Sequence, residues 1–179
     1  MSALLGPLLA LWLAVFAPQP TLPPLAVSPT LTVSASPTVT LAAVGDLMMA
    51  RSIGRALQRS PADTPLADVA DALRAADVTV GNLECALGVA GRPAAKSYTF
   101  RGPPTAANAL RDAGFDVVTL ANNHSLDMGW DGIVKTLDNI EAAGLVHVGT
   151  YRTLSEKATP FIADVSGIKL AFLNYTATT

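Results

Sequence analysis

The sequence of 179 residues contains a single cysteine, Cys85. One thiol cannot form an intrachain disulfide, and it excludes a zinc site built from several thiolates. We expect Cys85 to pack as a small apolar residue at a strand end; the alternative is a reactive thiol. The chain also lacks a Gly-rich phosphate loop, a GxSxG nucleophile elbow and a dinucleotide-binding fingerprint. The common nucleotide sites and the α/β-hydrolase serine site are therefore excluded.

Charge is missing from the beginning of the chain. No charged side chain precedes Asp46, and all twelve Lys and Arg residues lie at or after Arg51. The net charge is −2 and there is no basic run, which argues against nucleic acid as a partner. The abrupt change in composition separates a tail of about 38 residues from one globular domain.

The tail divides into two pieces. Residues 4–17 are an apolar run of signal-peptide length, shorter than the roughly 20 residues that span a bilayer. We therefore predict a signal peptide over 1–17, with an uncleaved anchor or a wrongly chosen start codon as alternatives. Residues 18–38 hold six prolines among Ser, Thr and Val and predict an extended linker. Export would make the domain extracytoplasmic, and without a nearby cysteine we expect no lipid anchor.

From residue 39 onward, apolar β-branched runs alternate with amphipathic segments. The pattern predicts strands over 39–44, 77–80, 115–120 and 145–148, helices over 47–58, 67–75, 103–113 and 131–143, and a helical turn over 154–158. Two further strand-like runs, 161–165 and 168–175, flank a Ser-Gly pair that is typical of a hairpin. Residues 39–44 carry so little polarity that we expect burial on both faces. Repeated βα units predict an α/β fold with a largely parallel sheet.

Polar side chains follow three of the predicted strands. They are Asp46, then Asn82 with Glu84, then Asn123 with His124. Because parallel strands bring their carboxyl ends to one edge of a sheet, we expect these side chains to converge. Carboxylate, amide and imidazole donors suit Mn²⁺, Fe²⁺ or Zn²⁺. The alternative is that Asn122 and Asn123 only form a turn and that His124 is a surface residue.

Asp127 lies three residues beyond His124. A carboxylate at this spacing either orients the imidazole through a hydrogen bond or caps the helix that follows. The sequence favours neither interpretation.

Five segments carry a resemblance to a known family. They are GDLM at 45–48, GNLE at 81–84, YTFRGP at 98–103, ANNHSLDMG at 121–129 and GIKLAFL at 167–173. In order and spacing they resemble motifs of the CapA family of bacterial capsule and poly-γ-glutamate synthesis proteins, which is related to the calcineurin-like metallophosphatases. The resemblance implies a layered metallophosphatase-like sheet with helices on both faces. Residues 39–179 would be the N-terminal part of that domain, truncated at its C-terminus.

The resemblance also implies roles for individual residues. Asp46, Glu84 and Asn123 would bind a divalent metal ion (Mn, Fe or Zn), and His124 would be the catalytic proton donor. Asn82 and Asp127 would support these ligands. Arg101 would face an anionic substrate; the alternative is a solvated loop residue.

The sequence also departs from the phosphatase pattern. Met48 stands where those enzymes carry a histidine, and no counterpart of their later histidines is present, since His147 fits none of the motifs. We expect a metal-dependent hydrolase acting on a polyanionic polymer or a phosphoester, with residues 39–179 inactive alone. The alternative is a non-catalytic extracytoplasmic component of a membrane-bound polymer synthesis or export assembly.

Overall fold

The computed structural model describes residues 37–60, 64–153, 156 and 159–177. The predicted signal segment, nearly all of the predicted linker and most of the predicted turn over 154–158 lie outside these residues. Within the described part, no helix has the length and apolar character needed to cross a membrane.

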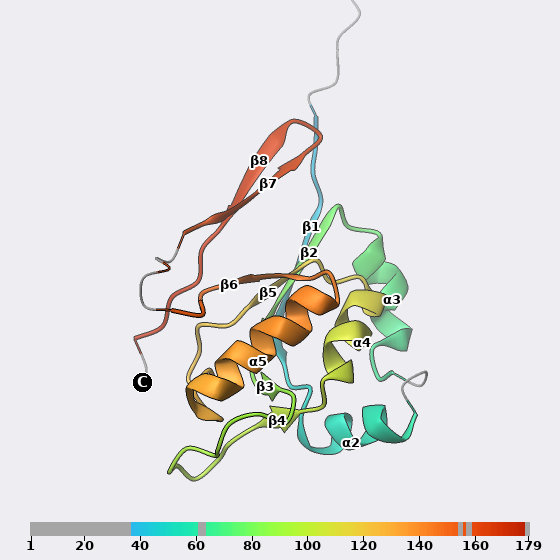
Figure 1. Ribbon diagram of the computed structural model, residues 1–179. Helices are drawn as coiled ribbons and strands as arrows, with labels where there is room; N and C mark the ends of the chain where they lie inside the picture. Colours follow the sequence, from blue (N-terminus) through green and yellow to red (C-terminus); the bar gives the residue numbers. More distant parts are fainter. Residues whose placement is uncertain (1–36, 61–63, 154–155, 157–158, 178–179) are drawn as a thin grey trace, which may run out of the picture. The chain divides into compact units, whose positions relative to one another are not determined.

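A four-stranded parallel sheet forms the centre of the domain (Figure 1). Its strands, in spatial order, are β1 (Leu41–Leu47), β2 (Val78–Leu83), β5 (Val117–Thr119) and β6 (Val146–Val148). All three neighbouring pairs are parallel. The predicted α/β class and parallel sheet are therefore confirmed.

The helices lie close to their predicted positions. They are α2 (Arg51–Arg59), α3 (Ala67–Arg74), α4 (Thr105–Ala113) and α5 (Gly129–Ala142). Helix α4 ends at Gly114, whose φ of 104° is easily adopted only by glycine. Helix α2 starts four residues later than predicted because β1 continues to Leu47, which pairs with Leu83 of β2.

The order of the strands explains how the two faces of the sheet are covered. Because each successive strand is added on the same side, right-handed crossovers place the connecting helices on one face. Residues of all four described helices share one large core cluster, which includes Leu57, Leu73, Leu110 and Leu137. In the described residues the second face is covered by a hairpin instead of the predicted helices.

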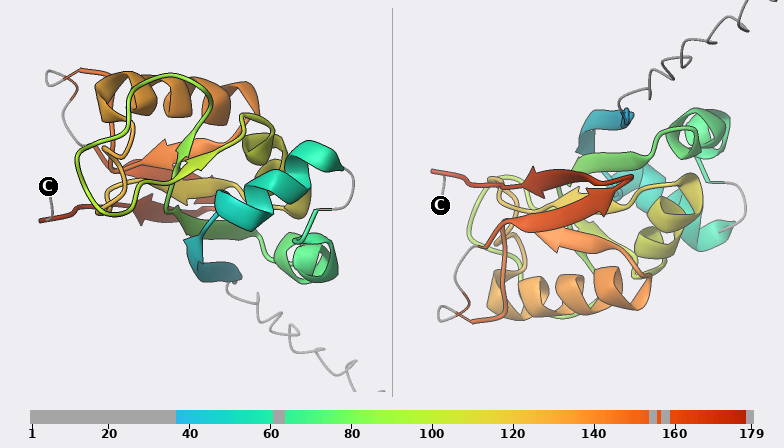
Figure 2. Two further views of the ribbon diagram at one scale, coloured as in Figure 1. Left: turned by 90° about the horizontal axis from the view of Figure 1, so that it is seen from below. Right: turned by 90° about the horizontal axis from the view of Figure 1, so that it is seen from above.

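The hairpin consists of β7 (Phe161–Val165) and β8 (Ile168–Phe172), which are antiparallel as predicted. Its apolar residues form a second, smaller cluster with Val78, Val117 and Val148 of the sheet. Figure 2 shows α5 and this hairpin on opposite sides of β6.

Strand β1 is an edge strand, and the prediction that it is buried on both faces is wrong for the described part. Leu41 is 50% exposed and Val44 is 39% exposed. The apolar composition of β1 suggested a central strand. However, β1 has no neighbour on its outer side among the described residues.

A small two-stranded sheet was not predicted. Strands β3 (Ala86–Leu87) and β4 (Arg101–Gly102) are parallel to each other. Leu87 is fixed to α5, because Thr136 Oγ1 accepts its N–H at 2.9 Å and Asn139 Nδ2 donates to its carbonyl at 3.1 Å. The pairing of β3 with β4 holds the end of the loop over residues 88–100 beside the loop that follows β5.

Candidate functional site

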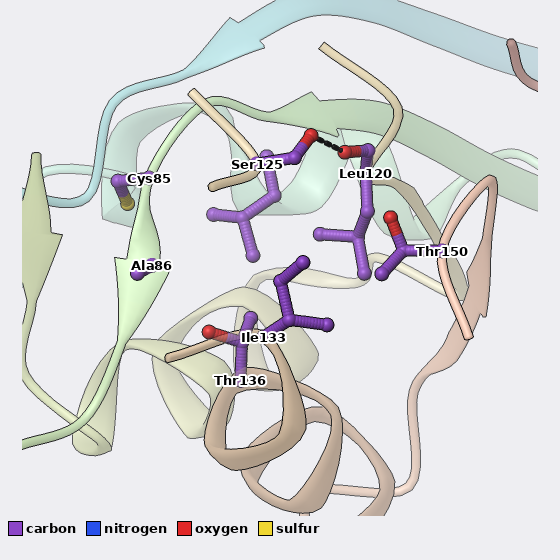
Figure 3. A pocket seen from close by; sticks show the side chains of 8 residues that line it. Cys85, Ala86, Leu120, Ser125, Ile133, Thr136 and Thr150 are labelled. Carbon is purple, nitrogen blue, oxygen red and sulfur yellow. Dashed lines mark hydrogen bonds between the residues drawn. The ribbon is translucent and has the colours of Figure 1, made fainter. Parts of the chain in front are cut away.

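The loop after β5 is built by its own side chains. Asn122 Oδ1 accepts the His124 N–H at 2.8 Å, and the Ser125 hydroxyl donates to the carbonyl of Leu120 (Figure 3). The turn predicted for Asn122 is thus present. His124 is not a surface residue, since it is only 9% exposed.

The tips of the three adjacent strands β1, β2 and β5 are linked by hydrogen bonds. Asn82 Nδ2 donates to Asp46 Oδ1 at 2.7 Å. Asn82 Oδ1 accepts from Thr119 Oγ1 at 3.2 Å and from Asn122 Nδ2 at 3.1 Å. The parallel register, which pairs Asp46 with Asn82 and Asn82 with Thr119, brings these side chains to one edge of the sheet.

Asp127 is completely buried and contacts the imidazole of His124. The distance from His124 Nδ1 to Asp127 Oδ2 is 2.8 Å. The same carboxylate accepts the Phe100 N–H and pairs with the ammonium of Lys96. No side chain caps α5, so the geometry favours orientation of the imidazole over helix capping.

The other ring nitrogen of His124 points toward Glu84. His124 Nε2 lies 3.9 Å from Glu84 Oε1, which is too long for a hydrogen bond. The Phe100 ring packs against the imidazole with 4.2 Å between centroids. His124 is therefore held on three sides, by Asp127, Phe100 and its own loop.

His124 opens onto a surface cleft. Its lining includes Asn123, Lys96 and Phe100 from the two neighbouring loops, and Arg51 from the start of α2. Asn123 is exposed, and its carbonyl accepts from Lys96 Nζ at 2.8 Å. The amide that joins the strand-tip network belongs to Asn122, whereas the predicted metal ligand Asn123 faces the cleft.

Arg101 lines the neighbouring surface hollow, which Arg51 and Phe100 also border. Its guanidinium donates to the carbonyl of Gly91 at 2.9 Å and contacts the sulfur of Met128 at 2.8 Å. It does not line the cleft of His124. Arg51 does line that cleft, although the sequence indicated only a polar face of a helix at this position.

Cys85 is buried behind the loop that follows β5, and its side chain lines a small apolar pocket (Figure 3). Burial raises the pKa of the thiol to about 12. The packing role predicted for Cys85 is consistent with both observations, because a neutral buried thiol is unreactive.

The strand tips supply part of a metal-binding set. Asp46, Glu84 and His124 are donors that suit a borderline or hard divalent ion. However, the described residues contain no group of three or more His, Cys, Asp or Glu side chains placed to hold a metal. Asp46 is engaged by Asn82, and Glu84 faces His124 instead. Among the described residues, carboxylates and imidazoles alone therefore assemble no three-ligand metal site.

Comparison with known proteins identifies the family. Residues 40–179 match the family model for the bacterial capsule synthesis protein PGA_cap. The capsule biosynthesis protein CapA of Bacillus anthracis is 28% identical over 142 residues, which cover 77% of this chain and 34% of the relative. The PGA biosynthesis protein CapA of Bacillus subtilis (strain 168) is 30% identical over 136 residues, which cover 74% and 36%.

A third relative, the uncharacterized protein y4sH of Sinorhizobium fredii, is 28% identical over 142 residues, covering 75% of this chain and 30% of the relative. The chain thus spans about a third of the length of the curated relatives it matches. Members of this metallophosphatase-like family usually bind metal ions. The matched region includes every described strand and helix, and the chain belongs to the bacterial capsule synthesis protein family PGA_cap.

Proposed function

We propose that this protein acts in the synthesis or export of an anionic capsule polymer such as poly-γ-glutamate, as a hydrolase with His124 as its proton donor. The names of the Bacillus relatives support the biological process. The contact between His124 and the buried Asp127 carries the chemical part of the proposal. The apolar, uncharged beginning of the chain supports an extracytoplasmic location.

The geometry assigns each nitrogen of His124 a different task. Asp127 holds Nδ1, which fixes the orientation of the ring and leaves Nε2 to exchange a proton with the substrate. Nε2 would donate its proton to the leaving oxygen, and general acid catalysis of this kind contributes about 10²–10⁴ in rate.

A divalent metal ion belongs to this proposal, with Asp46 and Glu84 as the residues of this chain that would hold it. Asn123, exposed beside His124, would be a third donor after a change of rotamer. Since the chain covers about a third of its relatives, we propose that the whole protein supplies the remaining ligands. When bound, such an ion supplies Lewis acidity at the strand tips.

One observation favours a second candidate function. The described residues do not bring together three His, Cys, Asp or Glu side chains that could hold a metal, and Asp46 is already hydrogen-bonded to Asn82. A non-catalytic component of a membrane-bound polymer synthesis or export assembly would keep the fold and need no metal. In that case His124 and Asp127 would serve only to hold two loops together.

The two functions can be separated with the full-length protein and two variants. Metal content and hydrolysis of model phosphoesters and of poly-γ-glutamate would be measured with Mn²⁺, Fe²⁺ and Zn²⁺. Asp46→Asn removes a charged ligand, so metal content and activity should fall together. His124→Ala should leave the metal bound and lower the rate, most for poor leaving groups.

His147→Ala is the matched control, because His147 lies on β6, pairs with Glu141 of α5 and does not line the cleft. Its rate should equal that of the parent protein. A parent that hydrolyses neither substrate class with any of the three metals, while both variants still support polymer output in cells, would leave only the non-catalytic function.

A further inference from the structure

Arg51 is held against the same aromatic ring as the candidate proton donor. Its guanidinium carbon lies 4.5 Å from the centroid of the Phe100 ring and 5.7 Å from that of Tyr98. The Phe100 ring also packs on His124 at 4.2 Å. Arg51, Phe100 and His124 all line one cleft, so the guanidinium and the imidazole face the same space.

The backbone of Arg51 is in an unusual conformation. Its φ is 53°, and Ser166 in the hairpin turn is the only other described non-glycine residue with a positive φ. The left-handed region is unfavourable for an L-residue with a Cβ, and residues strained in this way cluster at active and ligand-binding sites. A glycine or asparagine would adopt this conformation more easily, so the local fold does not by itself explain an arginine here.

The charge of Arg51 is also uncompensated. No described carboxylate lies within ion-pair distance of its guanidinium, whereas Lys96, the other cation in the cleft, pairs with Asp127. No Asp or Glu is among the residues that line the cleft. A guanidinium that rests on aromatic faces keeps its N–H groups available at its edge, and this planar edge suits the oxygens of a carboxylate or a phosphate.

We propose that Arg51 is a substrate-binding residue whose guanidinium holds a carboxylate or phosphate group of the substrate in the cleft beside His124. The inference rests on the proposed function for the reaction that follows binding, but the binding itself needs no catalysis. On this proposal the anion is recognised by Arg51 and not by Arg101, because the Arg101 guanidinium already contacts Gly91 and Met128.

The test measures binding of two probes, inorganic phosphate and glutarate, to the full-length protein by isothermal titration calorimetry. Arg51→Asn removes the charge and tolerates the positive φ. We expect its dissociation constant for the preferred anion to rise about tenfold or more, the value for losing a charge-assisted pair. The probe that binds the parent more tightly identifies the anionic group. Arg51→Lys should restore phosphate binding better than glutarate binding, since lysine lacks the planar fork.

Arg55→Asn is the matched control, because Arg55 lies one turn further along α2 and lines only the neighbouring hollow, whereas Arg51 borders both that hollow and this cleft. Its affinity should stay within about twofold of the parent value, a difference well below the contribution of one charged pair. Thermal unfolding of each variant establishes that the fold is intact.

Three results would overturn the inference: no saturable binding of either anion to the parent, unchanged affinity in Arg51→Asn, or equal weakening by Arg55→Asn. The proposed reaction can fail separately. If the parent hydrolyses nothing but loses anion binding on Arg51→Asn, the binding role stands alone. If the parent is active and Arg51→Asn alters neither KM nor anion affinity, only the binding role is wrong.

Discussion

Asp127 is the residue on which the candidate site depends most, because one buried carboxylate contacts His124, Lys96 and the backbone of Phe100. Asp127→Asn keeps the size of the side chain but leaves Lys96 charged beside a neutral amide. We expect a loss of about 3 kcal/mol, the low end for breaking a buried pair, since Lys96 is partly exposed. Urea unfolding of the full-length protein would measure it.

The control for Asp127 is Asp131→Asn in the exposed first turn of α5, which should change stability by less than about 0.5 kcal/mol. Adding Lys96→Met to Asp127→Asn should recover part of the loss, because the uncompensated cation is then gone. If the double variant is no more stable than Asp127→Asn, the ion pair is not the source of the effect.

Cys85 gives a prediction about alkaline pH. Burial raises the pKa of its thiol to about 12, against 9.0 for the unperturbed group. Well below pH 9 the thiol is neutral in both states, so its ionisation does not change the stability there. Between about pH 9 and 12 the unfolded state loses the proton first, and the free energy of unfolding therefore falls as pH rises.

We therefore expect the free energy of unfolding of the parent to decline more steeply above pH 9 than that of Cys85→Ala, measured by urea unfolding at pH 8, 9 and 10. A thiol reagent should modify Cys85 only after unfolding. Rapid modification of the folded protein at pH 8 would contradict the buried, neutral thiol.

At the residue scale, the sequence predicts the strand-tip side chains well and the arginines poorly. Asp46 and Asn82 follow recognisable strands, so the parallel register alone brings them together. Arg51 lines the cleft of His124, and Arg101 does not. Nothing in a linear pattern indicates that the Arg101 guanidinium meets loop carbonyls or that Arg51 rests on two aromatic rings.

At the scale of elements, Asn174 attaches the segment after β8 to the loop that carries His124. Its Oδ1 accepts the Ala121 N–H at 2.5 Å. A Cβ on Gly149 would meet the same Oδ1 at 2.2 Å, so the three segments are in close contact. Asn174→Ala leaves the Ala121 N–H without this partner and should cost about 1–3 kcal/mol.

Hydrogen exchange and urea unfolding would test the Asn174 contact. The Ala121 amide should exchange faster in Asn174→Ala, and its neighbours in the loop should follow. Lys169→Ala on the exposed side of the hairpin should change neither quantity, since its ion pair with Asp164 is long at 3.9 Å and largely exposed. If Asn174→Ala and Lys169→Ala give the same exchange rates and the same stability, the Asn174 contact does not stabilise the loop.

Long helices and strands with a clear periodicity could be predicted from the sequence, and very short strands could not. Helix α5 presents Ile133, Leu137 and Ile140 on one buried face, and its sequence shows that spacing directly. Strands β3 and β4 have two residues each, too few for any periodic pattern, so the sequence suggested only irregular structure there. The exposure of β1 could not be predicted either, because composition does not distinguish an edge strand from a central one.

At the scale of the molecule, large apolar side chains remain exposed on both the edge strand and the hairpin. They include Leu41 and Val44 on β1, Ile162 on β7, and Leu173 and Tyr175 after β8. Unpaired edges and apolar patches of this kind promote association. Residues 39–179 expressed alone should therefore aggregate or remain molten. Size-exclusion chromatography and thermal unfolding would check this, and a monomer with a cooperative transition would show that the piece is self-sufficient.

The strand order β1-β2-β5-β6 has a consequence for how the chain acquires its structure. Each strand pairs with one that precedes it in the chain: Val78 with Leu41, Val117 with Val80, and Val146 with Val117. Among the described strands of this sheet, every strand after β1 therefore has a partner that precedes it in the chain. A chain that emerges N-terminus first, from a ribosome or from a membrane pore, can therefore add each strand to an edge already in place. Assembly in the order of emergence keeps unpaired edges short-lived, which limits misassociation during folding.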